Sequence, residues 1–91
     1  MNVAEVFAFP ARLTHPEAMG VLAALTAAMA AGCHRIDLGA LSEFDSTALA
    51  VLLAARRAAQ GQAQPVFLKV PDKLRRLASL YGLDGLVFDA P

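Results

Sequence analysis

The sequence has few of the side chains that metal centres, disulfides and cofactor sites need. Cys33 is the single cysteine in 91 residues, so no disulfide framework can form. A lone thiol suits a reducing compartment, and we expect Cys33 to be a packing residue because free cysteine is often buried. His15, His34 and this one thiol give no metal-ligand spacing, and Gly39 stands alone rather than in a phosphate-cradling glycine loop. We therefore expect no metal and no cofactor.

An excess of charge and a long apolar run are also missing. Eight basic and eight acidic residues cancel, whereas nucleic-acid binding normally needs a basic patch; we interpret Arg56–Arg57 and the segment 69–76 as solvated helix faces. The apolar stretch 18–31 is shorter than the about 20 residues that span a bilayer. Glu5 and Pro10 interrupt the N-terminal segment, which does not resemble a secretory signal. We expect a cytoplasmic protein that neither binds nucleic acid nor inserts into a membrane.

Apolar residues are abundant, at 57% of the chain, and 91 residues fit one domain spanning 1–91. Segment 3–9 is predicted to be a strand ending before Pro10, and 11–14 a short second strand. Thr14 followed by Glu17 matches the spacing of a capping box, so a helix should begin near His15. Its expected buried face is marked by the three- and four-residue spacing of Ala18, Val21, Leu22, Leu25, Ala28 and Met29, and Gly32 is a plausible stop.

The second half repeats the alternation of strand and helix. We predict a strand over 35–38, a turn over 39–44, a helix over 45–59, a strand over 66–70 and a helix from a cap at Asp72 to Leu80. A last short strand is expected over 86–88. Strands that alternate with helices indicate mainly parallel pairing. The predicted fold class is therefore α/β, with a small, mixed, largely parallel sheet and helices packed on it.

The junction before the second long helix is the one place where polar groups gather in a recognisable order. The sequence reads Ile-Asp-Leu-Gly-Ala-Leu-Ser-Glu-Phe-Asp-Ser-Thr-Ala-Leu-Ala over 36–50. Asp45 can cap the helix, and Ser46 and Thr47 stand at the positive end of its dipole. A phosphate on Ser46 would be favoured there and would change the surface charge strongly. From spacing alone, a plain helix cap is the favoured interpretation.

This segment resembles the core signature of STAS domains, in which hydrophobic-Asp-Leu and a short turn precede Asp-Ser-x-x-Leu at the start of an Ala/Leu-rich helix. The flanking segments 11–14, 66–70 and 81–88 also resemble the family, so the similarity covers nearly the whole chain. The family includes anti-anti-sigma factors, transporter-linked domains and MlaB, a small component of bacterial phospholipid ABC transport systems. The resemblance implies a STAS fold and a protein that works by docking onto a partner.

Two branches of the family imply two functions. In the anti-anti-sigma branch, Ser46 would be phosphorylated by an anti-sigma kinase. Here Thr47-Ala48 stands where that branch usually has Ser-Gly, and Thr14 replaces its early aspartate. MlaB-like members tolerate both features, so the resemblance is closest to them.

We therefore predict a non-catalytic subunit that binds the ATPase of a phospholipid ABC transporter, and thereby sits at the inner face of the membrane. The expected contact residues are Phe44, Asp45, Ser46, Thr47 and Leu49. The alternative is an anti-anti-sigma factor regulated by phosphorylation at Ser46. A nucleophile pair of Ser46 with a histidine would lack the Gly-x-Ser-x-Gly elbow, so we expect no enzyme.

Overall fold

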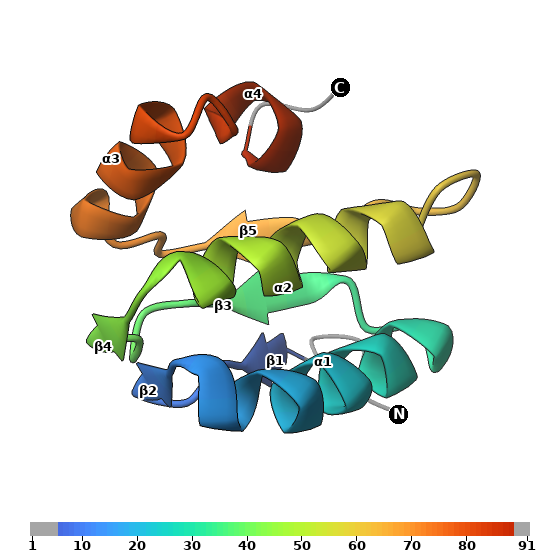
Figure 1. Cartoon of the computed structure of the whole chain (residues 1–91). Coiled ribbons are helices and arrows are strands. Elements are labelled where there is room, and N and C mark those ends of the chain that lie inside the picture. Colours follow the sequence, from blue (N-terminus) through green and yellow to red (C-terminus); the bar gives the residue numbers. More distant parts are fainter. Residues whose placement is uncertain (1–5, 89–91) are drawn as a thin grey trace.

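A three-stranded parallel sheet forms the centre of the molecule, and two long helices cross it side by side (Figure 1). The computed structural model describes residues 6–88. The sheet has the order β1-β3-β5, and a separate parallel pair joins β2 to β4. The strands are β1 (Val6–Ala8), β2 (Arg12–Leu13), β3 (Arg35–Asp37), β4 (Glu43–Phe44) and β5 (Val66–Leu68), and the helices are α1 (His15–Ala30), α2 (Ser46–Ala58), α3 (Asp72–Leu80) and α4 (Asp84–Val87).

The direction of the chain follows from parallel pairing, which needs a crossover between successive sheet strands. α1 carries the chain from β2 back to β3, and α2 carries it from β4 back to β5. Both helices run opposite to the strands, and their first turns lie at the same end of the molecule (Figure 1). The segments that precede both helices therefore meet at one edge of the fold.

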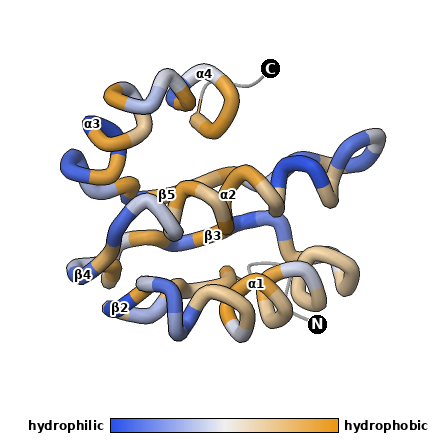
Figure 2. Tube along the Cα trace, in the orientation of Figure 1, coloured by the Kyte–Doolittle hydropathy of each residue, from blue (hydrophilic) through white to orange (hydrophobic). Residues whose placement is uncertain are grey.

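The hydrophobic core lies where the sheet meets α1, α2 and α3. Phe7, Ile36 and Phe67 are register partners across the three strands, and side chains in one row of a sheet point to the same face. Ile36 in the middle is fully buried, as are Leu52 of α2 and Leu74 of α3. Figure 2 shows the same division, with hydrophobic colour along the middle of α2 and hydrophilic colour at β2, at β4 and near the end of α2.

Most of the elements predicted from the sequence are present. The capping box at the start of α1 is confirmed: the Glu17 carboxylate accepts hydrogen bonds from the backbone N–H and the hydroxyl of Thr14, both at 2.8 Å. Gly32 follows the end of α1 with a φ of 103°, in the region that favours glycine. Cys33 is buried at 8% exposure, as expected. Residues 3–5 of the predicted first strand lie outside the described residues.

The predicted final strand over 86–88 is wrong, because Leu86 and Val87 belong to the short helix α4 and Phe88 is its C-cap. Gly82, with a φ of 71°, reverses the chain after α3, so the next residues pack back onto α2 and α3 instead of reaching the sheet edge. Val87 is fully buried there, and its N–H donates to the carbonyl of Leu83, which closes a helical turn. A short apolar run such as Leu-Val-Phe occurs both in buried helical turns and in strands, so its composition does not distinguish the two.

A smaller correction concerns the start of α3. The cap of α3 is Pro71, and Asp72 is the first helical residue. The negative charge of Asp72 is still favourable there, because it lies at the positive end of the helix dipole.

Within residues 6–88, no helix combines the length and the apolar character that crossing a bilayer requires.

Candidate functional site

The pairing of β2 with β4 brings the starts of α1 and α2 together. Leu13 and Phe44 are register partners, and the residue after each is the cap of the following helix: Thr14 for α1 and Asp45 for α2. Parallel strands in register leave their sheet side by side. The two helix starts, far apart in the sequence, thus form one continuous surface, which we call the paired-cap surface and define as Arg12, Thr14, His15, residues 43–47 and Lys73.

The Asp45 carboxylate is fixed by the helix that it caps. Its Oδ1 accepts a hydrogen bond from the backbone N–H of Thr47 at 2.9 Å. Hydrogen bonds from the side chain and backbone of Thr47, with a smaller electrostatic contribution from His15, lower the pKa of Asp45 from its ordinary value of 3.8. The group is therefore charged at neutral pH and held in one orientation at the surface.

A single guanidinium ties the two halves of this surface together. Arg12 Nη1 lies 2.8 Å from a carboxylate oxygen of Glu43 across the β2–β4 pair, and Arg12 Nε lies 3.2 Å from Glu17 in the first turn of α1. The hydrogen bonds from Thr14, together with the nearby charge of Arg12, lower the pKa of Glu17. Charge-assisted contacts of this kind fix orientation even where they add little to stability.

The start of α3 also reaches this surface. Lys73 Nζ lies 5.9 Å from the centre of the Phe44 ring, within the range of a cation–π contact. Phe44 is half-buried and packs against the core. The aromatic ring thus links the paired-cap surface to the interior, and the exposed Lys73 lies over the ring of the residue that precedes Asp45.

The turn from β3 to β4 is closely packed at Gly39, where a larger residue would require the side chains of Asp37 and Lys69 to shift. A side chain at Gly39 would place its Cβ 3.0 Å from Asp37 Oδ1 and 3.1 Å from Lys69 Cδ. The same Asp37 oxygen accepts the Gly39 N–H at 2.7 Å, while the N–H groups of Ser42 and Glu43 both donate to the carbonyl of Ala11. These bonds hold the approach to α2 in place.

The structure brings four of the five predicted contact residues to the surface. Asp45 and Ser46 are exposed, and Phe44 and Thr47 are half-buried. Leu49 is the correction: it is 1% exposed, because it lies on the face of α2 that packs into the core. Leu49 therefore supports the surface from beneath and cannot itself contact a partner in this conformation.

Sequence reasoning missed the two cations of the surface, Arg12 and Lys73. Arg12 had one available signal, since it lies five residues before the capping glutamate Glu17, in the same stretch as Thr14. Lys73 had none, because its neighbour Phe44 lies 29 positions earlier in the chain. Within residues 6–88, no group of three or more His, Cys, Asp or Glu side chains is arranged to hold a metal ion.

Comparison with known proteins gives one match. A family model described as "Mlab, STAS domain" matches residues 10–88 of the chain. Neither the curated proteins nor the solved structures contain a significant match. The matched range includes both helix starts and every residue of the paired-cap surface.

Proposed function

Because the chain belongs to the MlaB-like STAS domain family, we propose that it is a non-catalytic interaction subunit that binds the ATPase of a phospholipid ABC transporter through the paired-cap surface. The observation that carries the proposal is the exposed pair Asp45–Ser46 at the capped start of α2, inside the matched range. Such a subunit needs no catalytic group of its own, since ATP would be bound and hydrolysed by the partner. The chain would act in the cytoplasm, at the inner face of the membrane.

The geometry supports docking because the surface is rigid before any partner arrives. Asp45 is held by Thr47, and Arg12 is held by Glu17 and Glu43. A preorganised surface loses less conformational entropy on binding than a mobile one. Ser46 stands in the middle, with an exposed hydroxyl that can donate and accept hydrogen bonds.

The size of a stable interface sets how far the contact must extend. Specific complexes usually bury about 800 Å² on each partner, which is more than Asp45, Ser46 and Thr47 can supply. The contact should therefore include Phe44 and Lys73 on one side and Arg12 on the other. The surface carries charges of both signs, with Arg12 and Lys73 as cations and Glu43 and Asp45 as anions, so we expect a partner surface that also carries both signs.

Affinity capture of the transporter ATPase by the purified chain tests the proposal. We expect Ser46→Arg and Ser46→Glu to reduce the captured ATPase at least about tenfold, because a large charged side chain at the centre of an interface is costly to bury. Glutamate is favourable in the first turn of a helix. A loss of binding by Ser46→Glu therefore reports the interface and not unfolding of α2.

Ser79 provides the matched control, because it is an exposed serine on a different helix, α3. Ser79→Arg and Ser79→Glu should capture as much ATPase as the parent chain. If both Ser46 variants bind the ATPase as well as the parent does, the proposal is wrong.

The matched family does not favour the alternative role as an anti-sigma antagonist. The two roles differ in what they require of Ser46: a transporter subunit uses the free hydroxyl, whereas the antagonist cycles through a phosphoserine. Intact-mass spectrometry of the chain isolated from its own cells should give the unmodified mass in growing and in starved cultures. A species heavier by one phosphate, mapped to Ser46, would support the antagonist instead.

A further inference from the structure

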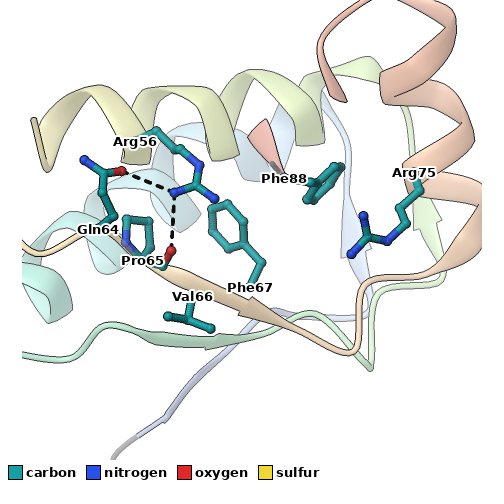
Figure 3. A pocket seen from close by; sticks show the side chains of 7 residues that line it. All are labelled: Arg56, Gln64, Pro65, Val66, Phe67, Arg75 and Phe88. Atoms are coloured by element: carbon teal, nitrogen blue, oxygen red, sulfur yellow. Dashed lines mark hydrogen bonds between the residues drawn. The ribbon is translucent and has the colours of Figure 1, made fainter. Parts of the chain in front are cut away.

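An open pocket lies beside the C-terminal half of α2 and shares no residue with the paired-cap surface. Its volume is about 300 Å³, and its walls come from α2, from the segment leading into β5, from α3 and from the end of α4 (Figure 3). The lining residues are Arg56, Gln64, Pro65, Val66, Phe67, Arg75 and Phe88. Two guanidinium groups and two phenyl rings thus share one cavity.

The two rings of this pocket lie between its two cations. The Arg56 guanidinium lies 5.0 Å from the centre of the Phe67 ring, and the Arg75 guanidinium lies 5.0 Å from the centre of the Phe88 ring. The two rings meet edge to face, with their centres 6.1 Å apart. Figure 3 shows the consequence: the rings lie between the guanidinium groups, so the pocket has a positive charge at either end of an aromatic middle.

Arg56 is held rigidly, but by neutral groups. Its Nε donates to the carbonyl of Val87 at 2.6 Å, and its Nη1 donates to Gln64 Oε1 at 3.3 Å and to the carbonyl of Pro65 at 3.4 Å. Nη2 is left to face the pocket. Partial burial lowers the pKa of Arg56 from its ordinary value, since neutral acceptors replace lost hydration only in part.

Arg75 is exposed on α3 and has the whole fork of its guanidinium available. Among residues 6–88, no carboxylate forms an ion pair with Arg56 or Arg75; the three ion pairs in that range belong to Arg12 and Lys69. Two guanidinium groups without an acidic partner, at the ends of one cavity, are an arrangement that an anion of matching shape would neutralise.

We propose that this pocket binds an elongated small-molecule dianion, with one anionic group at Arg56, one at Arg75 and an apolar middle over Phe67 and Phe88. The two charges of the ligand match the two guanidinium groups, and its middle matches the rings between them. The site does not overlap the paired-cap surface, so the proposal is independent of the transporter function.

Suberate, an eight-carbon dicarboxylate, is the probe, and octanoate, with the same carbon count and one carboxylate, is its control. Titrations followed by amide chemical shifts in the ¹⁵N-labelled chain should show saturable shifts at Gln64, Phe67 and Phe88 with suberate. We expect a dissociation constant of about 1 mM for a ligand of this size. Octanoate should bind about tenfold more weakly, because it can form only one of the two charge-assisted contacts.

Arg75 and Arg76 make a matched pair of variants, since both are exposed on α3 and only Arg75 lines the pocket. Arg75→Gln should weaken suberate binding about tenfold, to the level of octanoate, whereas Arg76→Gln should change it less than twofold. Both variants lose the same net charge, so a difference between them cannot come from long-range electrostatics.

Three results would overturn the proposal. The first is the absence of saturable shifts at the pocket residues with suberate. The second is equal binding of octanoate and suberate, or equal loss in the two arginine variants, because either would remove the need for two anionic ends. The third concerns Asp89, which follows Phe88 in the sequence and lies outside the described residues. If the parent chain fails to bind suberate and the Asp89→Asn variant binds it, the anion that belongs in this pocket is the carboxylate of Asp89 and not a small molecule.

Discussion

Arg12 and Glu43 face each other across the β2–β4 pair, with Nη1 and a carboxylate oxygen 2.8 Å apart. The contact joins two segments that are separated by the whole of α1 and β3. Because Arg12 also reaches Glu17 at the start of α1, it connects the two helix starts of the paired-cap surface. Its side chain is 54% exposed, so its effect should be on the arrangement of this surface more than on global stability.

The first prediction follows from that exposure. Arg12→Ala should lower the free energy of unfolding by less than about 1 kcal/mol, since exposed ion pairs contribute little. It should nevertheless weaken capture of the ATPase, because β4 and the first turn of α1 lose their common tether. Urea denaturation measures the first effect, and Arg76→Ala serves as the control for loss of an exposed arginine. A loss of more than about 2 kcal/mol would show that Arg12 is a core structural element instead.

The second prediction concerns the cap of α2. Asp45→Ala removes the acceptor for the Thr47 N–H and should lower the melting temperature by about 5 °C, as loss of a helix cap commonly does. Asp45→Asn keeps an oxygen in the same place and should retain most of the stability. Thermal unfolding followed by circular dichroism distinguishes them. Equal destabilisation by both variants would mean that the charge, and not the hydrogen bond, is what the helix needs.

The third prediction is a dependence of stability on pH that comes from the two helix starts. Glu17 and Asp45 both have a pKa lowered in the folded chain, from ordinary values of 4.5 and 3.8. Groups of this kind stabilise the folded state fully above their unfolded pKa, and that stabilisation is lost as the pH falls through the folded pKa. The urea midpoint should therefore be flat from pH 7 to about pH 5 and should fall below about pH 4.5.

A double variant, Glu17→Gln with Asp45→Asn, isolates this effect. Neither replacement can titrate, so the difference in urea midpoint between parent and variant should shrink as the pH is lowered from 5 to 3. A constant difference over this range would show that other carboxyl groups are responsible for the acid sensitivity.

The parts of the fold that the sequence predicted correctly are those set by neighbours in the chain. The Thr14–Glu17 capping box and the Asp45 cap each depend on residues two or three positions apart. The placement of Lys73 beside Phe44 depends on where α3 docks, and no local pattern encodes that. The spacing of Leu49 from Leu52 already places Leu49 on the inward face of α2, and its burial confirms that placement and not its predicted role as a contact residue.

The same difference between local and long-range contacts explains why the strand predicted over 86–88 was wrong. Val87 suits a strand by composition, yet it is buried between helices because Gly82 turns the chain back onto α2 and α3. Arg56 of α2 holds α4 in this position, because its Nε donates a hydrogen bond to the carbonyl of Val87. A contact over 31 positions is invisible to a search for periodicity.

The last prediction tests that contact directly. Arg56→Gln removes the 2.6 Å hydrogen bond to Val87 and the bonds to Gln64 and Pro65, so it should lower the free energy of unfolding by about 1–3 kcal/mol, the range for a charged donor lost from a part-buried site. Arg57→Gln is the control, because Arg57 is its exposed neighbour on α2, and it should change stability by less than about 0.5 kcal/mol. Amide hydrogen exchange locates the effect: the protected amides of Val87 and Phe88, which close the turn of α4, should exchange faster in Arg56→Gln, while Leu52 in the middle of α2 should stay protected up to global unfolding. If α4 exchanges at the parent rate in that variant, its attachment comes from the burial of Val87 alone.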